Sequence, residues 1–198
     1  MATLVLDLDG VVILGHPDGG RWDKNIECDL GMDPKRLGHF FRTHFPAVVL
    51  GEADLLETLE RVWPELECPE DHRSFVDYWF AKDSRLNTEV LDQVDTWRAG
   101  GHKAYLATVQ EHHRATHIWN VLGLNGHFDD ILYSAALGAK KPDPDFFKRA
   151  IARLPVTSPD EILFLDDKEE NVAAANAMNW RAFHYSIPND LRKAIASL

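Results

Sequence analysis

The 198 residues of the chain are enough for one domain with a sizeable hydrophobic core, or for a core with a modest insertion. The 21 basic and 32 acidic residues give a formal net charge of −11, with no basic run that could follow a phosphate backbone, which argues against a nucleic-acid partner. Two cysteines are too few for a disulfide framework, and no signal-peptide pattern or apolar stretch near the roughly 18 residues of a membrane span is present, so we expect a cytoplasmic protein without a membrane partner.

The first predicted strand, residues 5–12, contains two carboxylates, Asp7 and Asp9, followed by Gly10. Strand side chains alternate, so residues two apart point the same way and the two carboxylates converge. Like charges about 4 Å apart repel by roughly 4 kcal/mol at an effective dielectric of about 20. The pair therefore indicates a metal cation, a shared proton or a chemical role. A polar cap of an Asp-Gly turn is the simpler alternative.

The next part of the chain, from about residue 13 to 86, carries helical patterns. A helix begins at Asp33-Pro34, residues 53–63 place their apolar side chains on one face, and the aromatic residues near position 79 mark a third helix. We expect a small helical bundle at residues 14–86, inserted into a core domain formed by residues 1–13 and 87–198.

From residue 87 onward, short apolar segments alternate with helical ones. After a helix near residues 87–99, the predicted strands are residues 103–108, 131–134, 162–165 and 181–185. The predicted helices between them are residues 111–122, 144–154 and 169–178. This alternation is typical of an α/β fold with a Rossmann-like parallel sheet flanked by helices.

Polar residues follow several of these strands. The second strand ends at Thr108, the loop after the third contains Lys141, and the fourth is followed by Asp166-Asp167. Each has a simpler explanation: a helix N-cap, a solvated cation and an acidic helix start. Ligands of parallel sheets bind beyond the carboxyl ends of the strands. The recurrence at several strand ends, together with the first acid pair, therefore favours one common site.

The ordered set of motifs resembles the haloacid dehalogenase superfamily, in its branch of α-helical-cap phosphatases and phosphomutases. That family has an Asp-x-Asp after the first strand, a Ser or Thr after the second, a Lys, and a final acid pair. The matching residues here are Asp7 and Asp9, Thr108, Lys141, and Asp166 with Asp167. The resemblance covers residues 4–14 and about 87–187, and the helical insert occupies the place of the family's cap.

The resemblance implies a role for each of these residues. Asp7 would attack phosphorus and form an aspartyl-phosphate, while Asp9 would act first as general acid and then as general base. Thr108 and Lys141 would hold phosphoryl oxygens. Mg²⁺ is the implied cofactor, because the site offers only oxygen ligands. The implied metal ligands are Asp7, the backbone carbonyl of Asp9, and Asp167, with Asp166 beside them or just behind them.

The expected activity is hydrolysis of a phosphomonoester of a small metabolite, for example a sugar phosphate. There are two alternatives. One is a phosphomutase, and the other is a non-catalytic module that binds a phosphometabolite or a protein. The intact motifs argue against the non-catalytic module. Dehalogenation is not expected, since the founding dehalogenases lack an acid at the position of Asp9. Related enzymes often carry Asn directly after the second motif. Val109 here removes a side chain that could contact substrate.

His113 and His117 lie four residues apart in the predicted helix at 111–122. This spacing is compatible with a shared metal ion. No third ligand or His-Glu-x-x-His pattern accompanies them, so we interpret them as part of a solvated helix face.

Overall fold

The computed structural model describes residues 2–198, and its centre is a parallel five-stranded sheet with the strand order β5-β4-β1-β6-β7. The strands are β1 (Thr3–Leu6), β4 (Lys103–Thr108), β5 (Asp130–Tyr133), β6 (Ile162–Asp166) and β7 (Arg181–His184). In the middle of the sheet, Leu6 of β1 lies opposite Leu106 of β4 and Leu165 of β6. The chain runs outward from β1 through β4 to β5, then returns to the other side of β1. The predicted α/β class with a parallel sheet is confirmed.

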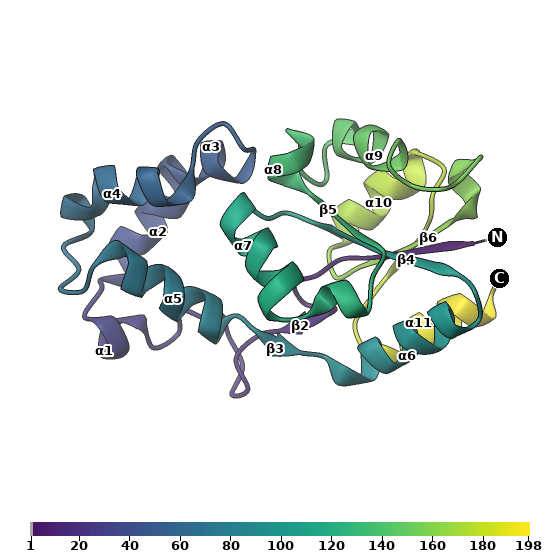
Figure 1. The fold of residues 1–198 in the computed structure, drawn as a ribbon, viewed down its shortest axis with the longest axis horizontal. Helices are drawn as coiled ribbons and strands as arrows, with labels where there is room; N and C mark the ends of the chain where they lie inside the picture. The colour runs from purple at the N-terminus through teal and green to yellow at the C-terminus, as the bar shows by residue number, and fades with distance from the viewer. Residues whose placement is uncertain (1) are drawn as a thin grey trace.

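Helices cover both faces of the sheet (Figure 1). One face packs against α6 (Thr88–Ala99), α7 (His112–Thr116) and α11 (Pro188–Ala196), and the other against α9 (Pro144–Ile151) and α10 (Glu169–Ala177). Successive residues of β1 serve the two layers, because Leu4 and Leu6 join one hydrophobic cluster and Val5 joins the other. Alternating side chains of a strand buried on both faces explain its continuous apolar run.

Several predicted elements have different bounds in the structure: the helix predicted at 144–154 ends at Ile151, and two other elements differ more strongly. The predicted strand at 5–12 ends with β1 at Leu6, and residues 7–12 form a turn in which the backbone N–H groups of Val12 and Ile13 donate to Leu8 O at 2.8 Å. Gly10, at φ 86°, reverses the chain there. The predicted helix at 111–122 is α7 followed by a π-helical turn, His117–Val121.

Shorter elements complete the core domain. A short helix, α8 (Ser134–Leu137), follows β5 and precedes the loop that carries Lys141. Two 3₁₀ turns, Leu124–Gly126 and Pro159–Glu161, precede β5 and β6 respectively.

The helical insert begins and ends at a two-stranded antiparallel ribbon, in which Ile13 of β2 (Ile13–Leu14) pairs with Leu86 of β3 (Arg85–Leu86). Between these strands lie α1 (Ile26–Leu30), α2 (Pro34–Thr43), α3 (Phe45–Val49), α4 (Leu55–Leu66) and α5 (His72–Lys82), on the left of Figure 1. These helices enclose a hydrophobic cluster of their own, rich in aromatic rings. No helix within residues 2–198 is both long and apolar enough to cross a membrane.

Aspartates start three helices of the insert: Asp33 caps α2, Asp54 caps α4 and Asp71 caps α5. Asp54 Oδ1, for example, accepts hydrogen bonds from the backbone N–H groups of Leu56 at 2.8 Å and Glu57 at 3.1 Å. Such caps satisfy backbone donors that have no partner within the helix, and each stabilises the fold by roughly 1 kcal/mol. The Asp54 cap fixes where α4 begins, and the same side chain also contacts the core domain.

Candidate active site

The carboxyl ends of β1, β4 and β6 bring the predicted site residues together. Asp7 directly follows β1, Thr108 is the last residue of β4, and Asp166 is the last residue of β6. Lys141 reaches the same point from the loop after α8. Its Nζ donates to Asp7 Oδ1 at 2.8 Å and to Asp166 Oδ2 at 2.5 Å, and its side chain is 1% exposed. One buried cation thus bridges two buried carboxylates.

Asp7, Asp166 and Asp167 form a group that could hold a metal ion, since one carboxylate oxygen of each lies within 4.8 Å of the others. Asp167 Oδ1 is buried and has no hydrogen-bond partner among residues 2–198. Lys141 offsets one of the three negative charges, so the carboxylates keep an excess of negative charge. A hard divalent cation bound by oxygen ligands fits this donor set.

Asp166 is the most restrained of these acids. Its Oδ1 accepts from the Lys168 backbone N–H at 2.9 Å, and Asn171 Nδ2 lies 2.9 Å and 3.0 Å from its two oxygens. Lys141 occupies Oδ2 as well. Both oxygens of Asp166 therefore already accept hydrogen bonds, whereas Asp167 Oδ1, which has no partner in the described part of the chain, is free to bind a metal ion. The sequence analysis did not identify Asn171, although its place in the first turn of α10, five positions after Asp166, is a local signal of this contact.

Asp9 lies in the turn after β1, and its carboxylate is not part of the metal-compatible group. Gln110 Nε2 donates to Asp9 Oδ2 at 2.7 Å, whereas Asp9 Oδ1 is buried without a partner within residues 2–198. The sequence reasoning missed Gln110. Its position two residues after Thr108 repeats the spacing of Asp7 and Asp9, and that was the available signal.

Burial changes the acidity of both carboxylates of the first motif. Burial raises the pKa of Asp7 to about 7, against the opposing charge of Lys141 and with a further increase from Asp166. Burial also raises the pKa of Asp9 to about 6, with Asp83 adding to the increase and Arg114 opposing it. A divalent cation beside Asp7 would favour the ionised carboxylate and lower its pKa again. A bound cation would therefore increase the fraction of Asp7 that is ionised at neutral pH.

Thr108 and Gly10 complete the surroundings of the carboxylates. Thr108 Oγ1 is buried and has no hydrogen-bond partner among residues 2–198, so a bound group could use its hydroxyl. Gly10 combines a left-handed backbone with close packing, because a Cβ there would lie 2.5 Å from Asp167 Oδ2. Only glycine fits between the turn and the final acid pair without displacing Asp167.

The insert docks against the core domain close to these strand ends. Ser134 Oγ lies 2.7 Å from Val49 O at the end of α3, and a Cβ on Gly51 would lie 2.4 Å from Ala135 O. His113 Nε2 lies 2.7 Å from Asp54 Oδ2 at the start of α4. The loop between α3 and α4 is thus held against α7 and α8.

Arg114 makes a second junction between the core domain and the insert. Its side chain is fully buried; Nη1 donates to Phe80 O at 3.2 Å, and Nη2 donates to Asp83 O and lies 3.6 Å from Asp83 Oδ2. The guanidinium also lies 5.2 Å from the centre of the Phe80 ring. A core-domain residue therefore holds the end of α5, the last helix of the insert.

The interpretation of His113 and His117 as a solvated face is wrong. His113 contacts Asp54 with its side chain 36% exposed, and the His117 ring packs against Phe80 at a centroid distance of 5.1 Å. Both side chains face the insert, because α7 packs between the sheet and α5. Among residues 2–198, they take no part in a group of three metal-compatible ligands.

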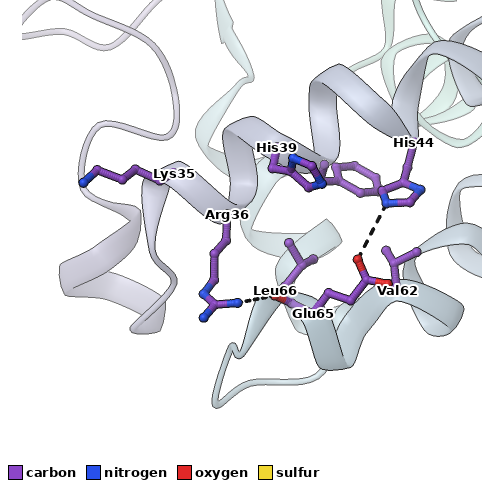
Figure 2. A pocket seen from close by; sticks show the side chains of 8 residues that line it. Lys35, Arg36, His39, His44, Val62, Glu65 and Leu66 are labelled. Atoms are coloured by element: carbon purple, nitrogen blue, oxygen red, sulfur yellow. Dashed lines mark hydrogen bonds and ion pairs between the residues drawn. The ribbon is translucent and has the colours of Figure 1, made fainter.

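Two cavities bear on where a substrate could bind. A cavity of about 240 Å³ lies beside Lys141 and is lined by Leu50 of the insert and by Lys140, Pro142 and Arg149 of the core domain. Another, of about 330 Å³, lies within the insert between α2 and α4 (Figure 2). Two of its polar side chains contact Glu65: Arg36 Nη1 donates to the backbone oxygen of Glu65 at 2.7 Å, and His44 Nε2 lies 3.8 Å from Glu65 Oε2. None of the strand-end residues lines this second cavity, whereas Lys141 lines the first.

Comparisons with known proteins agree with this arrangement. The sequence model of the haloacid dehalogenase-like hydrolases matches residues 1–179. A sesquiterpene phosphatase of Aspergillus oryzae is 42% identical over 57 residues, which span 29% of this chain and 29% of the length of that curated relative.

Solved structures extend the comparison to the whole fold. A haloacid dehalogenase family enzyme of Bacteroides thetaiotaomicron, in complex with magnesium, is 19% identical, with 93% of each chain covered and a TM-score of 0.77. The same enzyme has been solved with magnesium and inorganic phosphate. A β-phosphoglucomutase-like protein of Thermotoga maritima is 20% identical, with 98% of this chain and 91% of that chain covered and a TM-score of 0.60. At these identities the solved structures show a common fold.

Proposed function

The chain belongs to the haloacid dehalogenase-like hydrolase family, and we propose that it is a Mg²⁺-dependent phosphatase that hydrolyses the phosphomonoester of a small metabolite. The observation that carries this proposal is the contact of Lys141 with both Asp7 and Asp166, at 2.8 Å and 2.5 Å. It gathers a nucleophile, a cation for phosphoryl oxygens and a metal-compatible acid at one point. The matching segment of the sesquiterpene phosphatase supports phosphomonoester chemistry.

Asp7 is proposed as the nucleophile. One of its oxygens would form a bond to phosphorus while the bond from phosphorus to the leaving oxygen breaks. Asp9 would give its proton to that leaving oxygen, and would then take a proton from the water whose oxygen attacks the phosphorus and frees Asp7. Asp7 directly follows β1 and Asp9 lies two residues later in the turn, and this proximity supports the proposed steps.

Lys141 and Thr108 are proposed to bind the phosphoryl group. The lysine is charged and buried, so it attracts phosphoryl oxygens more strongly than an exposed cation would. The Thr108 hydroxyl has no partner within residues 2–198 and can donate to one of these oxygens. Both residues would thus stabilise the negative charge on the transferring group.

Asp7, Asp167 and the backbone carbonyl of Asp9 are proposed to hold Mg²⁺, with Asp166 restrained beside them by Asn171 and Lys141. When bound, Mg²⁺ would offset the charge of the acids and of the substrate phosphate. The unpartnered Asp167 Oδ1 and the excess of carboxylates around one lysine support this assignment.

The proposal favours phosphoryl chemistry over dehalogenation because of Asp9. A halide leaving group needs no proton, whereas an alkoxide leaving group does. The buried Asp9 carboxyl, held by Gln110, is suited to deliver one. A phosphomutase would use the same groups, and is distinguished by retention of the phosphoryl group in the product.

Release of inorganic phosphate from a panel of phosphorylated metabolites tests the proposal. The wild-type protein should release phosphate from at least one small phosphomonoester with Mg²⁺ present, and Asp7→Asn should release none while keeping its fold. Asp95→Asn is a matched control, because Asp95 is an exposed acid of α6 that is paired with His127 and does not line the cavity beside Lys141. No phosphate release by wild-type protein, with and without a sugar bisphosphate, would contradict the proposal. Conversion of a sugar phosphate without phosphate release would instead identify a mutase.

A further inference from the structure

We propose that Gln110 is a positioning residue for Asp9: it holds Oδ2 of the carboxyl group and thereby leaves Oδ1 as the oxygen that exchanges the catalytic proton. This inference rests on the proposed acid and base role of Asp9. It concerns a residue outside the four motifs that mark the family resemblance, and it assigns different tasks to the two oxygens of one side chain.

The geometry separates the two oxygens of Asp9. Gln110 Nε2 lies 2.7 Å from Oδ2, and Gln110 is itself 6% exposed. The other oxygen, Oδ1, is buried and has no hydrogen-bond partner within residues 2–198. An amide N–H group can only donate, so the Oδ2 that it contacts must accept. In the protonated acid, the proton is therefore carried by Oδ1.

Gln110 is fixed by the core domain. Its backbone oxygen accepts from the Ala135 N–H at 3.2 Å and lies 3.0 Å from Ser134 Oγ. Both partners belong to α8, and Ser134 also contacts Val49 of the insert. The backbone of Gln110 is thus held by α8, which itself contacts the insert, and the amide group of Gln110 reaches Asp9 from this fixed position.

A neutral partner suits this task better than a charged one. A lysine or arginine in contact with Asp9 would favour the ionised carboxylate and weaken it as an acid. The Gln110 amide orients the group in either protonation state, because Oδ2 can accept a hydrogen bond from it in both. Orientation matters because small misplacement of a proton donor lowers the rate strongly.

The proton transfer then follows from the assignment of the oxygens. In the first half-reaction, the bond from phosphorus to the leaving oxygen breaks, its electron pair stays on that oxygen, and the proton moves there from Asp9 Oδ1. In the second half-reaction, Oδ1 takes a proton from water as the water oxygen bonds to phosphorus and Asp7 leaves. The carboxyl group returns to its protonated state, and Oδ2 stays bound to Gln110 throughout.

The test compares two esters with different leaving groups. Gln110→Met keeps the length of the side chain and removes the N–H donor. We measure kcat and KM for p-nitrophenyl phosphate, whose leaving group needs little help from an acid, and for an alkyl phosphate, which needs a proton. For kcat/KM, which reports the first half-reaction, we expect a roughly 10-fold to 100-fold loss on the alkyl ester. This is less than or equal to the lower end of the usual scale of acid–base help, roughly 10²–10⁴-fold, because Asp9 itself is still present. We expect a several-fold smaller loss on the aryl ester.

Three further variants make the outcome decisive. Asp9→Asn gives the maximum loss to be expected on the alkyl ester, and Gln110→Ala replaces Gln110→Met if the latter does not fold. Gln93→Met is the matched control, because the Gln93 amide donates to Pro188 O at the start of α11. This variant should leave the ratio of the kcat/KM values for the two esters unchanged. Equal losses on both esters, or no loss on either, in a folded Gln110 variant would overturn the inference. A wild-type protein that releases phosphate from no ester of the metabolite panel, from which the alkyl ester is chosen, would instead overturn the proposed function.

Discussion

Lys141 Nζ lies 2.8 Å from Asp7 Oδ1 although 134 positions separate the two residues in the chain. The contact crosses from the loop after α8 to the end of the central strand β1. It therefore exists only when β1, β4 and β5 have assembled in their final order. The same contact joins the proposed nucleophile to the cation proposed to bind its substrate, so the site is complete only in the assembled sheet.

The stability of the metal-free protein should fall between acidic and mildly alkaline pH because of Asp7. Burial raises the pKa of Asp7 from 3.8 to about 7, so the folded protein binds this proton more tightly than the unfolded chain does. The resulting stability is complete below about pH 4 and is lost as the pH rises through about 7. The loss is on the order of a few kcal/mol.

Urea unfolding in chelator at pH 5 and pH 8 measures this effect. The free energy of unfolding should decrease less between these pH values in Asp7→Asn than in the wild-type protein. Asp145→Asn, which replaces an exposed acid paired with Lys148, should show the same pH dependence of the free energy of unfolding as the wild type. Saturating Mg²⁺ should reduce the difference, since a cation favours the ionised form of Asp7. Identical pH dependence in wild type and Asp7→Asn would contradict the assignment.

Metal removal should abolish activity reversibly. Mg²⁺ prefers an octahedron with bonds of roughly 2.0–2.1 Å, whereas Ca²⁺ accepts 6–8 ligands and often engages both oxygens of a carboxylate. Phosphate release should therefore vanish with a chelator, return with Mg²⁺ and fall when Ca²⁺ is added at fixed Mg²⁺. Asp167→Ala should raise the Mg²⁺ concentration needed for half-maximal activity at least 10-fold. Activity that resists chelation in the purified enzyme would refute the metal assignment.

Gly10→Ala should be severely impaired in activity and destabilised by at least about 1 kcal/mol. The φ of 86° is unfavourable for alanine, and the added Cβ would lie 2.5 Å from Asp167 Oδ2. The Asp167 carboxylate must then move, so Mg²⁺ affinity should fall as well. Gly126→Ala is the control, because a Cβ there meets nothing within 4 Å. Thermal unfolding and Mg²⁺ titration check both effects, and wild-type Mg²⁺ affinity in Gly10→Ala would be inconsistent with them.

Arg114→Met should destabilise the protein by about 3 kcal/mol or more, because it leaves the buried Phe80 carbonyl and Asp83 without their cationic partner. Arg192→Met is the control, since the Arg192 side chain is 64% exposed and its ion pair with Glu89 spans 3.8 Å. Thermal unfolding should show a clear drop for the first variant and little change for the second. An unchanged midpoint for Arg114→Met would show that the insert is held by its other contacts.

Local patterns were sufficient for the fold class and for the placement of the main site residues. Buried strands are continuous apolar runs, and the polar residues that follow them, such as Asp7, Thr108 and Asp166, lie at strand ends in any parallel sheet. The residue at which the first strand ends could not be found in this way. Leu8, Val11 and Val12 are fully buried in a turn, so their apolar character resembles that of a strand.

The tertiary structure alone decided which side chains restrain one another. Gln110 meets Asp9 across 101 positions, and Arg114 meets Phe80 across the junction between the core domain and the insert. Neither contact has a period or a fixed spacing, because each depends on how separate elements pack and not on the repeat of a helix or a strand. The sequence therefore determined which chemical groups the site contains. The packing of the turn after β1 against the β4–α7 loop, which α8 holds, determined which oxygen of Asp9 is bound by Gln110 and which has no partner within residues 2–198.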